Sequence, residues 1–202
     1  MEIHAPEHAI NTWREFFIHM GTITLGLVIA LGLEQAAEWT HHRHQLHIAE
    51  QNLQTELEAN RDTLAKDEAQ LGRSGKQLLA ILQAIDLIHK HGRPTSMQAQ
   101  WVWSDLESSA WDTARNTGTT AYMSYSQAEE FADRYHQQEL INLQADQYIH
   151  SIYLVMIPFA GGKKPDDLTP GDLDRIQQST ENALADLAHL QALCRGLDEE
   201  YK

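Results

Sequence analysis

The chain has 202 residues, enough for one globular core and one further segment but too few for two sizeable domains. Its formal charge of -14 would repel a phosphate backbone, which excludes nucleic acid as an expected partner. The single cysteine, Cys194, excludes an internal disulfide and supplies at most one soft metal ligand.

The first expected element is a transmembrane helix at residues 16–33, after a short tail at residues 1–15. Its sequence, FFIHMGTITLGLVIALGL, contains no Asp, Glu, Lys or Arg, and its polar residues are His19, Thr22 and Thr24. As a helix it covers about 27 Å, close to the thickness of the hydrocarbon core of a bilayer. Trp13 and Trp39 flank it, as indole rings do at membrane interfaces. The alternatives are a buried core helix and a cleavable signal peptide; a long preceding segment of nearly balanced charge disfavours the second.

The expected location is the bacterial inner membrane, crossed once. Arg14 and the terminal amine stand on one side of the span and Arg43 on the other, so the positive-inside comparison is nearly a tie. Because the N-terminal side has one more fixed positive group, while Glu34 and Glu38 follow the span, we expect the C-terminal domain to be periplasmic. Within the span, Thr22, Gly26 and Ala30 recur every four residues and predict close packing with a second copy.

A cluster of histidines follows the span. Glu38, His41, His42, His44 and His47 include several pairs three or four residues apart, which share a face of a helix. Imidazole and carboxylate at such spacing are ligands for zinc, so the cluster is a candidate metal site. The alternative is a solvated helix at the membrane surface, whose imidazoles respond to pH without a metal.

Residues 34–91 are expected to form one long, coiled-coil-like helix that continues out of the membrane. Its leucines are separated by steps of seven and one step of four, which indicates a narrow apolar seam: Leu46, Leu53, Leu57, Leu64, Leu71 and Leu78. We expect Leu57, Leu64 and Leu71 to contribute to self-association as well as to a bundle. The seam also contains Asn60, Asp67 and Ser74, which makes it imperfect for a long dimeric coiled coil. Gly72 and Gly75 are expected to interrupt or kink the helix.

Residues 98–202 are expected to complete an antiparallel helical bundle, so the fold class is all-α. One long helix should begin near Ser124 or Ser126, the latter forming a capping box with Glu129. The last should begin with Thr169 as N-cap and Pro170 in the first position. The aromatic residues of this region are candidates for a ligand pocket, with core packing as the alternative: Trp101, Trp103, Trp111, Tyr122 and Tyr125.

The sequence contains no pattern typical of a catalytic site. It has no Gly-rich phosphate loop, HExxH, paired CxxC or GxSxG, and Glu129, Glu130, Asp133 and His136 are groups that any solvated helix face presents. We therefore expect no enzymatic activity and no cofactor. The one exception is a zinc ion at the histidine cluster.

Three stretches, MEIHAPEHAINTWREFF, GLVIALGLEQAAEW and QNLQTELEANRDTL, resemble a group of uncharacterised bacterial single-pass membrane proteins with a short His-containing N-terminus and a helical soluble domain. The stretch AWDTARNTGTTAYMSYSQAEEFADRYHQQ resembles a second block of that group. The resemblance implies architecture and no reaction. The leading functional hypothesis is an oligomeric interaction or scaffold protein of the envelope that binds lipid bilayer, itself and a protein partner; a ligand-sensing bundle and a metal-binding protein are the alternatives.

Overall fold

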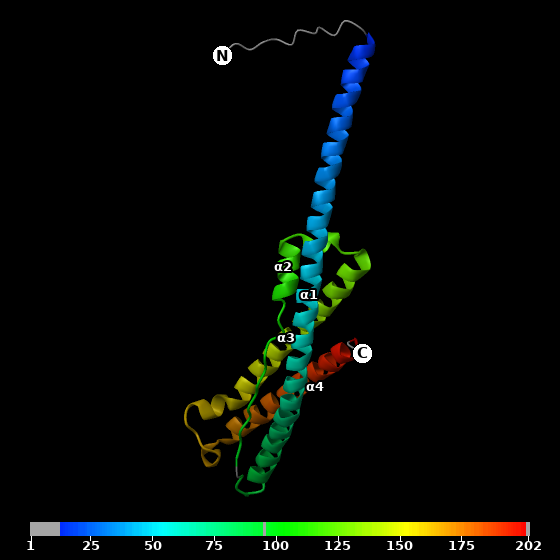
Figure 1. Cartoon of the computed structure of the whole chain (residues 1–202). Coiled ribbons are helices and arrows are strands. Elements are labelled where there is room, and N and C mark those ends of the chain that lie inside the picture. The colour runs from blue at the N-terminus through cyan, green and yellow to red at the C-terminus, as the bar shows by residue number, and fades with distance from the viewer. Residues whose placement is uncertain (1–12, 95, 201–202) are drawn as a thin grey trace. The chain divides into compact units, whose positions relative to one another are not determined.

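The computed structural model describes residues 13–94 and 96–200, and these fold entirely as helices and connecting segments (Figure 1). The helices in chain order are α1 (Trp13–His89), α2 (Ser109–Asn116), the short η1 (Thr119–Tyr122), α3 (Tyr125–Ala160), the short η2 (Pro165–Asp167) and α4 (Pro170–Glu200). The all-α prediction is confirmed. Of the predicted tail, residues 1–12 lie outside the described part, and α1 already begins at Trp13.

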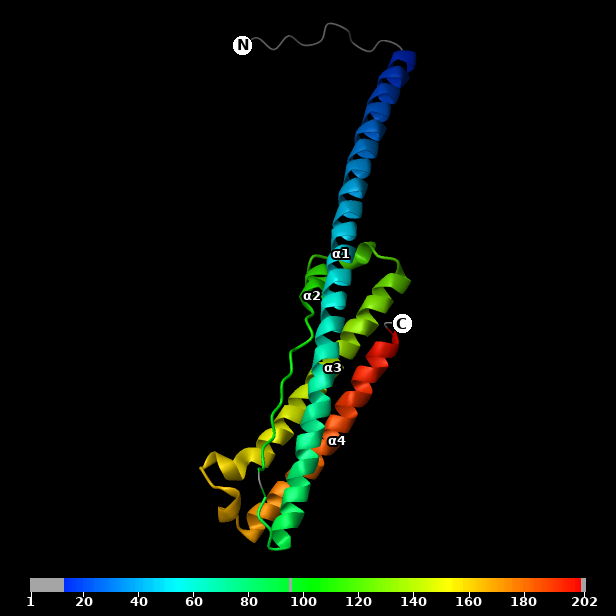
Figure 2. The ribbon, with the colours of Figure 1, turned by 60° about the horizontal axis from the view of Figure 1, so that its bottom comes forward.

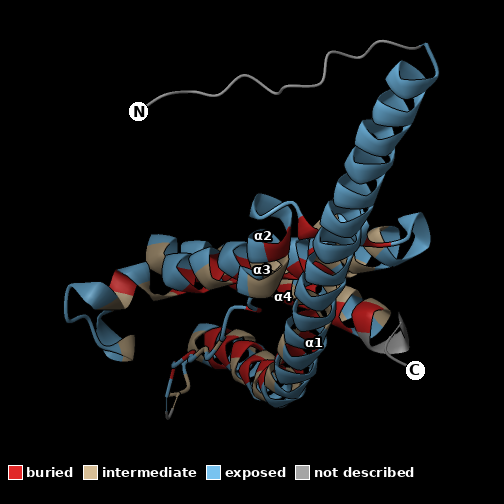
Figure 3. Cartoon of the chain, turned by 45° about the horizontal axis from the view of Figure 1, so that its top comes forward, coloured by how far each residue is buried: buried red, intermediate tan, exposed pale blue. Residues whose placement is uncertain are grey.

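Contacts divide the chain into two units, with the boundary between Ile48 and Ala49. In the first unit, the described residues are all helical, and their side chains are almost entirely exposed (Figure 3). In the second unit, the rest of α1 forms a bundle with α2, α3 and α4. Burial there is confined to the faces that the elements turn toward one another (Figure 3).

The bundle part of α1 buries a complete heptad seam. The buried positions alternate in steps of four and three: Leu53, Leu57, Asn60, Leu64, Asp67, Leu71, Ser74, Leu78, Ile81 and Ile85. Leu57, Leu64 and Leu71, expected to contribute to self-association, are each at most 4% exposed. Other residues of the same chain therefore cover these three side chains, and almost none of their apolar surface is exposed.

Helices α3 and α4 pack together as a hairpin beside α1. Asp186 of α4 joins them: its carboxylate accepts a hydrogen bond from the Ser151 hydroxyl, and its carbonyl accepts one from Gln144 Nε2. Cys194 is fully buried in α4 within the same core. The hydrophobic core therefore lies between α1, α3 and α4.

The helix boundaries confirm one predicted N-cap and correct another. Thr169 Oγ1 accepts from the Asp172 N–H at 3.2 Å, and Asp172 Oδ2 accepts from the Thr169 N–H at 3.0 Å, so α4 begins as the sequence predicts. Helix α3 begins after Ser124, one of its two predicted starts, and the Ser124 hydroxyl accepts from the Gln127 N–H. The Ser126–Glu129 alternative is wrong because Ser126 already lies inside the helix.

Gly72 and Gly75 do not interrupt α1, contrary to expectation. A Cβ atom at Gly72 would meet nothing within 4 Å, whereas one at Gly75 would lie 3.1 Å from Leu187 Cδ2. Gly75 therefore allows α4 to approach α1 closely, and the backbone of α1 stays helical around it.

The segment between α1 and α2 is extended, although the sequence predicts bundle helix from residue 98. We call residues 97–107 the strap; Figure 1 and Figure 2 both show it running back alongside α1. Four alternate strap residues are buried or half-buried against the core: Met97, Ala99, Trp101 and Trp103. This period of two is typical of extended chain.

Candidate functional site

The apolar stretch of α1 qualifies as a membrane span by length and composition. An 18-residue window within α1 has a mean hydropathy of 2.0, and none of it is buried by the rest of the protein. Exposed side chains such as Ile23, Leu27 and Val28 are therefore not covered by any described residue. Thr22, Gly26 and Ala30 are exposed on the same stretch, and a Cβ atom at Gly26 would meet nothing within 4 Å.

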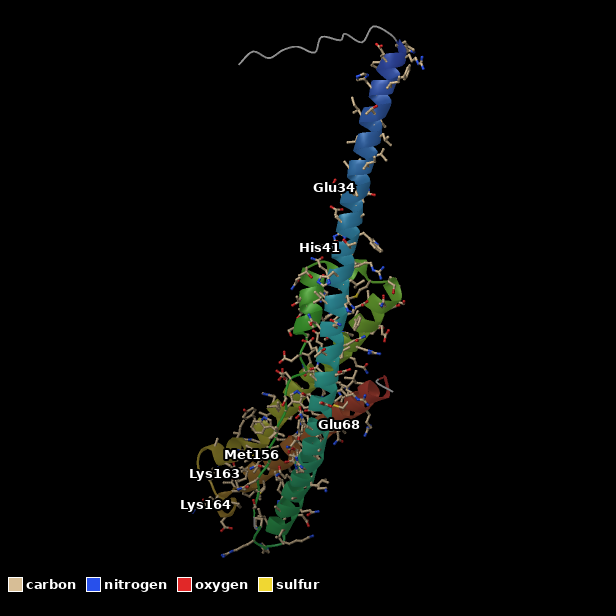
Figure 4. The ribbon with its side chains drawn as sticks, in the orientation of Figure 1. Glu34, His41, Glu68, Met156, Lys163 and Lys164 are labelled. Carbon is tan, nitrogen blue, oxygen red and sulfur yellow. The ribbon has the colours of Figure 1, made fainter. Side chains whose placement is uncertain are left out.

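The histidines that follow the apolar stretch lie on successive turns of α1, in the part that Figure 4 marks with Glu34 and His41. His41 Nε2 is paired with Gln45 Nε2 at 3.0 Å, and Arg43 lies over the Trp39 ring at 4.9 Å. Among residues 13–94 and 96–200, no group of three His, Cys, Asp or Glu side chains is placed to hold a metal ion. Within the described residues, Glu38, His41, His42, His44 and His47 therefore do not form a group of three metal ligands.

The polar members of the α1 seam have a shared role that the sequence analysis missed: they bind the backbone of the strap. Asn60 Nδ2 donates to the Glu107 carbonyl at 2.7 Å, and Asn60 Oδ1 accepts from the Glu107 N–H at 2.9 Å. The same amide nitrogen donates to Gln138 Oε1 of α3 at 2.9 Å. Asn60 thus joins α1, the strap and α3.

The next two polar seam positions repeat this arrangement. Asp67 Oδ2 accepts from the Ser104 N–H at 2.9 Å, and Ser74 Oγ donates to the Gln100 carbonyl at 2.6 Å. Seven helical residues rise about 10.5 Å, and three or four extended residues cover about 10–13 Å. The heptad repeat of α1 therefore matches the spacing of the strap.

Burial changes the ionisation of two groups in this layer. Asp67 is 3% exposed, and burial raises its pKa, while the Ser104 N–H and nearby Lys66 act in the opposite direction. Tyr148 is 1% exposed, and burial raises the pKa of its hydroxyl. That hydroxyl lies near Ser74, but it has no hydrogen-bond partner among the described residues.

Glu56 fixes the far end of the strap, where α2 begins. Its carboxylate accepts from the Ala110 N–H at 2.9 Å and from the Ser109 hydroxyl, so it caps the N-terminus of α2. The Tyr135 hydroxyl of α3 donates to Glu56 Oε1 at 2.8 Å. The Trp111 ring of α2 stacks on the Tyr135 ring, with centroids 5.6 Å apart.

An open groove of about 570 Å³ lies along this stack, between α2, α3 and the end of the strap. Trp111 and Tyr135 contribute aromatic surface, and Leu143 contributes aliphatic surface. The charged and titratable residues of the groove are Asp112, Arg115, His136, Glu139 and Asp146. The groove therefore offers an aromatic platform among acidic groups and a single arginine, an arrangement suited to a small polar or cationic ligand.

Of the aromatic residues predicted to form a pocket, only Trp111 lines this groove. Trp101 packs edge-on against Tyr153, with ring centroids 4.6 Å apart, and Trp103 packs against the core. Tyr122 and Tyr125 are exposed, at 44% and 82%. The five residues therefore do not converge.

The candidate acid–base groups of α3 lie on its surface. Glu130 pairs with Arg134 at 2.7 Å, and His136 Nδ1 lies 3.6 Å from Glu139 Oε2, both within one turn of helix. Glu129 and Asp133 are exposed.

Comparisons of the chain with protein-family models, with curated proteins and with solved structures found no match.

Proposed function

We propose that this chain is a membrane-anchored interaction protein of the bacterial envelope, in which residues 16–33 span the inner membrane and the unit that begins at Ala49 presents a binding surface. The observation that carries the proposal is the apolar window of α1, of which none is buried. In water, a stretch of this length with every large side chain exposed would be strongly unfavourable, and a bilayer removes that cost. The proposal assigns no reaction to the chain.

Extraction of membranes with alkaline carbonate tests the anchor. We expect the full chain to stay with the membrane pellet. The double variant Leu25→Arg/Val28→Arg should move to the supernatant, because each arginine costs about 2.5–3.5 kcal/mol in the centre of a spanning helix. Leu79→Arg/Leu87→Arg is the matched control, since both leucines are exposed on the bundle part of α1. Release of the unmodified chain by carbonate would refute the anchor.

The proposed orientation places the bundle in the periplasm. It rests on the charges around the span: Arg14 lies directly before the apolar stretch, whereas Glu34 and Glu38 follow it ahead of Arg43. A reporter active only in the periplasm, fused after Lys202, should be active, and a cytoplasm-active reporter at the same place should be silent. The reverse result would make the protein a membrane tether for cytosolic partners.

The groove between α2 and α3 supports a second candidate, a ligand-sensing bundle. Trp111 lines the groove, so occupancy should change its fluorescence. Titration with small amines and amino acids should give a saturable change that Trp111→Phe abolishes and Trp101→Phe, the matched control, retains. A screen without any saturable change would count against this candidate.

A further inference from the structure

Helix α3 has a second apolar face, on the side away from the core. Its members recur in steps of three and four and are all exposed: Leu140, Leu143, Gln147, His150, Leu154 and Ile157. We call this set the outer seam. The inner face of the same helix contains Ile141, Ala145, Tyr148 and Ile152, each at most 1% exposed. A helix that is apolar on two faces needs two partners, and the bundle supplies only one.

We propose that the outer seam pairs α3 with α3 of a second copy of this chain, in parallel. The pattern is that of a coiled-coil seam of about two and a half heptads with aliphatic residues at both ends. In a parallel pair, each residue contacts the equivalent residue of the other copy. The aliphatic residues of the seam then contact only aliphatic side chains: Leu140, Leu143, Leu154 and Ile157. Gln147 and His150 meet at the centre, where polar residues fix register and copy number at some cost in stability.

The charge of the chain points to this surface as the place of contact. Two copies with a formal net charge of -14 each repel one another, so the interface between them should contain few charged residues. Residues 147–162 contain no Asp, Glu, Lys or Arg; Figure 4 marks Met156 inside this stretch and Lys163 and Lys164 directly after it. Glu139 and Asp146 border the seam on its exposed side, and on the other side Gln144 and Ser151 are hydrogen-bonded to Asp186 of α4.

The parallel direction rests on the proposed anchoring. Gln127 Nε2 donates to Glu50 Oε1, so α3 begins at the end of the bundle where α1 enters it. A two-fold axis along α3 places both entry points at one end, as two copies in one bilayer require. An antiparallel pair would place them at opposite ends.

Single-cysteine cross-linking of the full chain in membranes tests the pairing and its direction. The wild-type chain, whose single thiol Cys194 is buried, is the background. Leu140→Cys and Ile157→Cys lie about 26 Å apart along α3. Each should form a disulfide-linked dimer with itself on mild oxidation, and Ala188→Cys, exposed on α4, should not. Cross-links only between Leu140→Cys and Ile157→Cys in a mixed sample would overturn the parallel pair.

Mass measurement of the purified full chain provides the second readout. Leu154→Glu should raise the dissociation constant of the dimer by about 10-fold or more, because each copy would place a carboxylate in the seam. Leu79→Glu, an exposed leucine on α1, is the matched control and should not change it. A monomeric wild-type chain, or equal loss of dimer in both variants, would overturn the proposal. If carbonate releases the chain from the membrane but the dimer is still weakened by Leu154→Glu and not by Leu79→Glu, the membrane anchor is refuted and the pairing of α3 is not.

Discussion

The side-chain amide of Asn60 binds the backbone of Glu107 through two hydrogen bonds, one from Nδ2 to the carbonyl and one to Oδ1 from the N–H. The two residues are 47 positions apart in the chain. An asparagine thus supplies to the strap both hydrogen bonds that a neighbouring β-strand would supply. A polar residue that weakens the seam as a coiled coil is therefore what joins the strap to the bundle.

Asn60→Leu should destabilise the bundle, although it makes the leucine seam regular. The substitution leaves the N–H and carbonyl of Glu107 without these partners in a partly buried place. We expect a loss of about 2 kcal/mol or more in the free energy of unfolding, measured by urea denaturation of the full chain in detergent. Asn52→Leu, at an exposed position of α1, is the matched control and should change stability by about 0.5 kcal/mol or less. Equal effects would contradict the role of Asn60.

Asp67→Asn should alter how stability depends on pH. Because burial raises the pKa of Asp67, the folded state binds this proton more tightly than the unfolded state. That contribution is complete below the unfolded pKa of about 3.9 and is lost as pH rises through the folded pKa. The stability of the wild type minus that of Asp67→Asn should therefore fall between acid and neutral pH. A difference that stays constant over this range would contradict the prediction.

Tyr148→Phe should change stability little, although Tyr148 is among the largest buried side chains. Its hydroxyl has no hydrogen-bond partner among the described residues, so its removal relieves a desolvation cost and leaves the ring in place. We expect an effect within about 1 kcal/mol in the same urea measurement. Ser74→Ala should cost more, because it leaves the Gln100 carbonyl without its donor. A larger loss of stability in Tyr148→Phe than in Ser74→Ala would show that the hydroxyls of Tyr148 and Ser74 are hydrogen-bonded to each other.

Gly72→Ala and Gly75→Ala should differ, although both glycines lie in α1 three residues apart. Alanine in an exposed helix stabilises by about 0.5–1 kcal/mol relative to glycine, which we expect in full at Gly72. At Gly75 the new methyl group would lie 3.1 Å from Leu187 Cδ2, so α4 must give way and the gain should be smaller or absent. Thermal unfolding of both variants checks this; equal gains would mean that α4 does not approach α1 at Gly75.

The sequence by itself determined the features that depend on local pattern. The uncharged stretch at residues 16–33 predicts a span, the spacing of Leu57, Leu64 and Leu71 predicts a buried seam, and Thr169 with Pro170 predicts the start of α4. Each of these follows from the order of neighbouring residues, because helical periodicity and capping involve positions only a few residues apart. The alternation of Met97, Ala99, Trp101 and Trp103 was a further local signal, and it would have identified the strap as extended.

Only the tertiary structure decided what covers each face. The partners of Asn60, Asp67 and Ser74 lie 47, 37 and 26 residues along the chain, and no local pattern specifies such pairs. The same holds for the groove, which requires α2 to lie against α3, and for the outer seam, whose exposure depends on which face of α3 meets α4. Apolar residues at steps of three and four show that one face of a helix is apolar. The tertiary fold determines whether other elements of the same chain cover that face or leave it exposed to a partner.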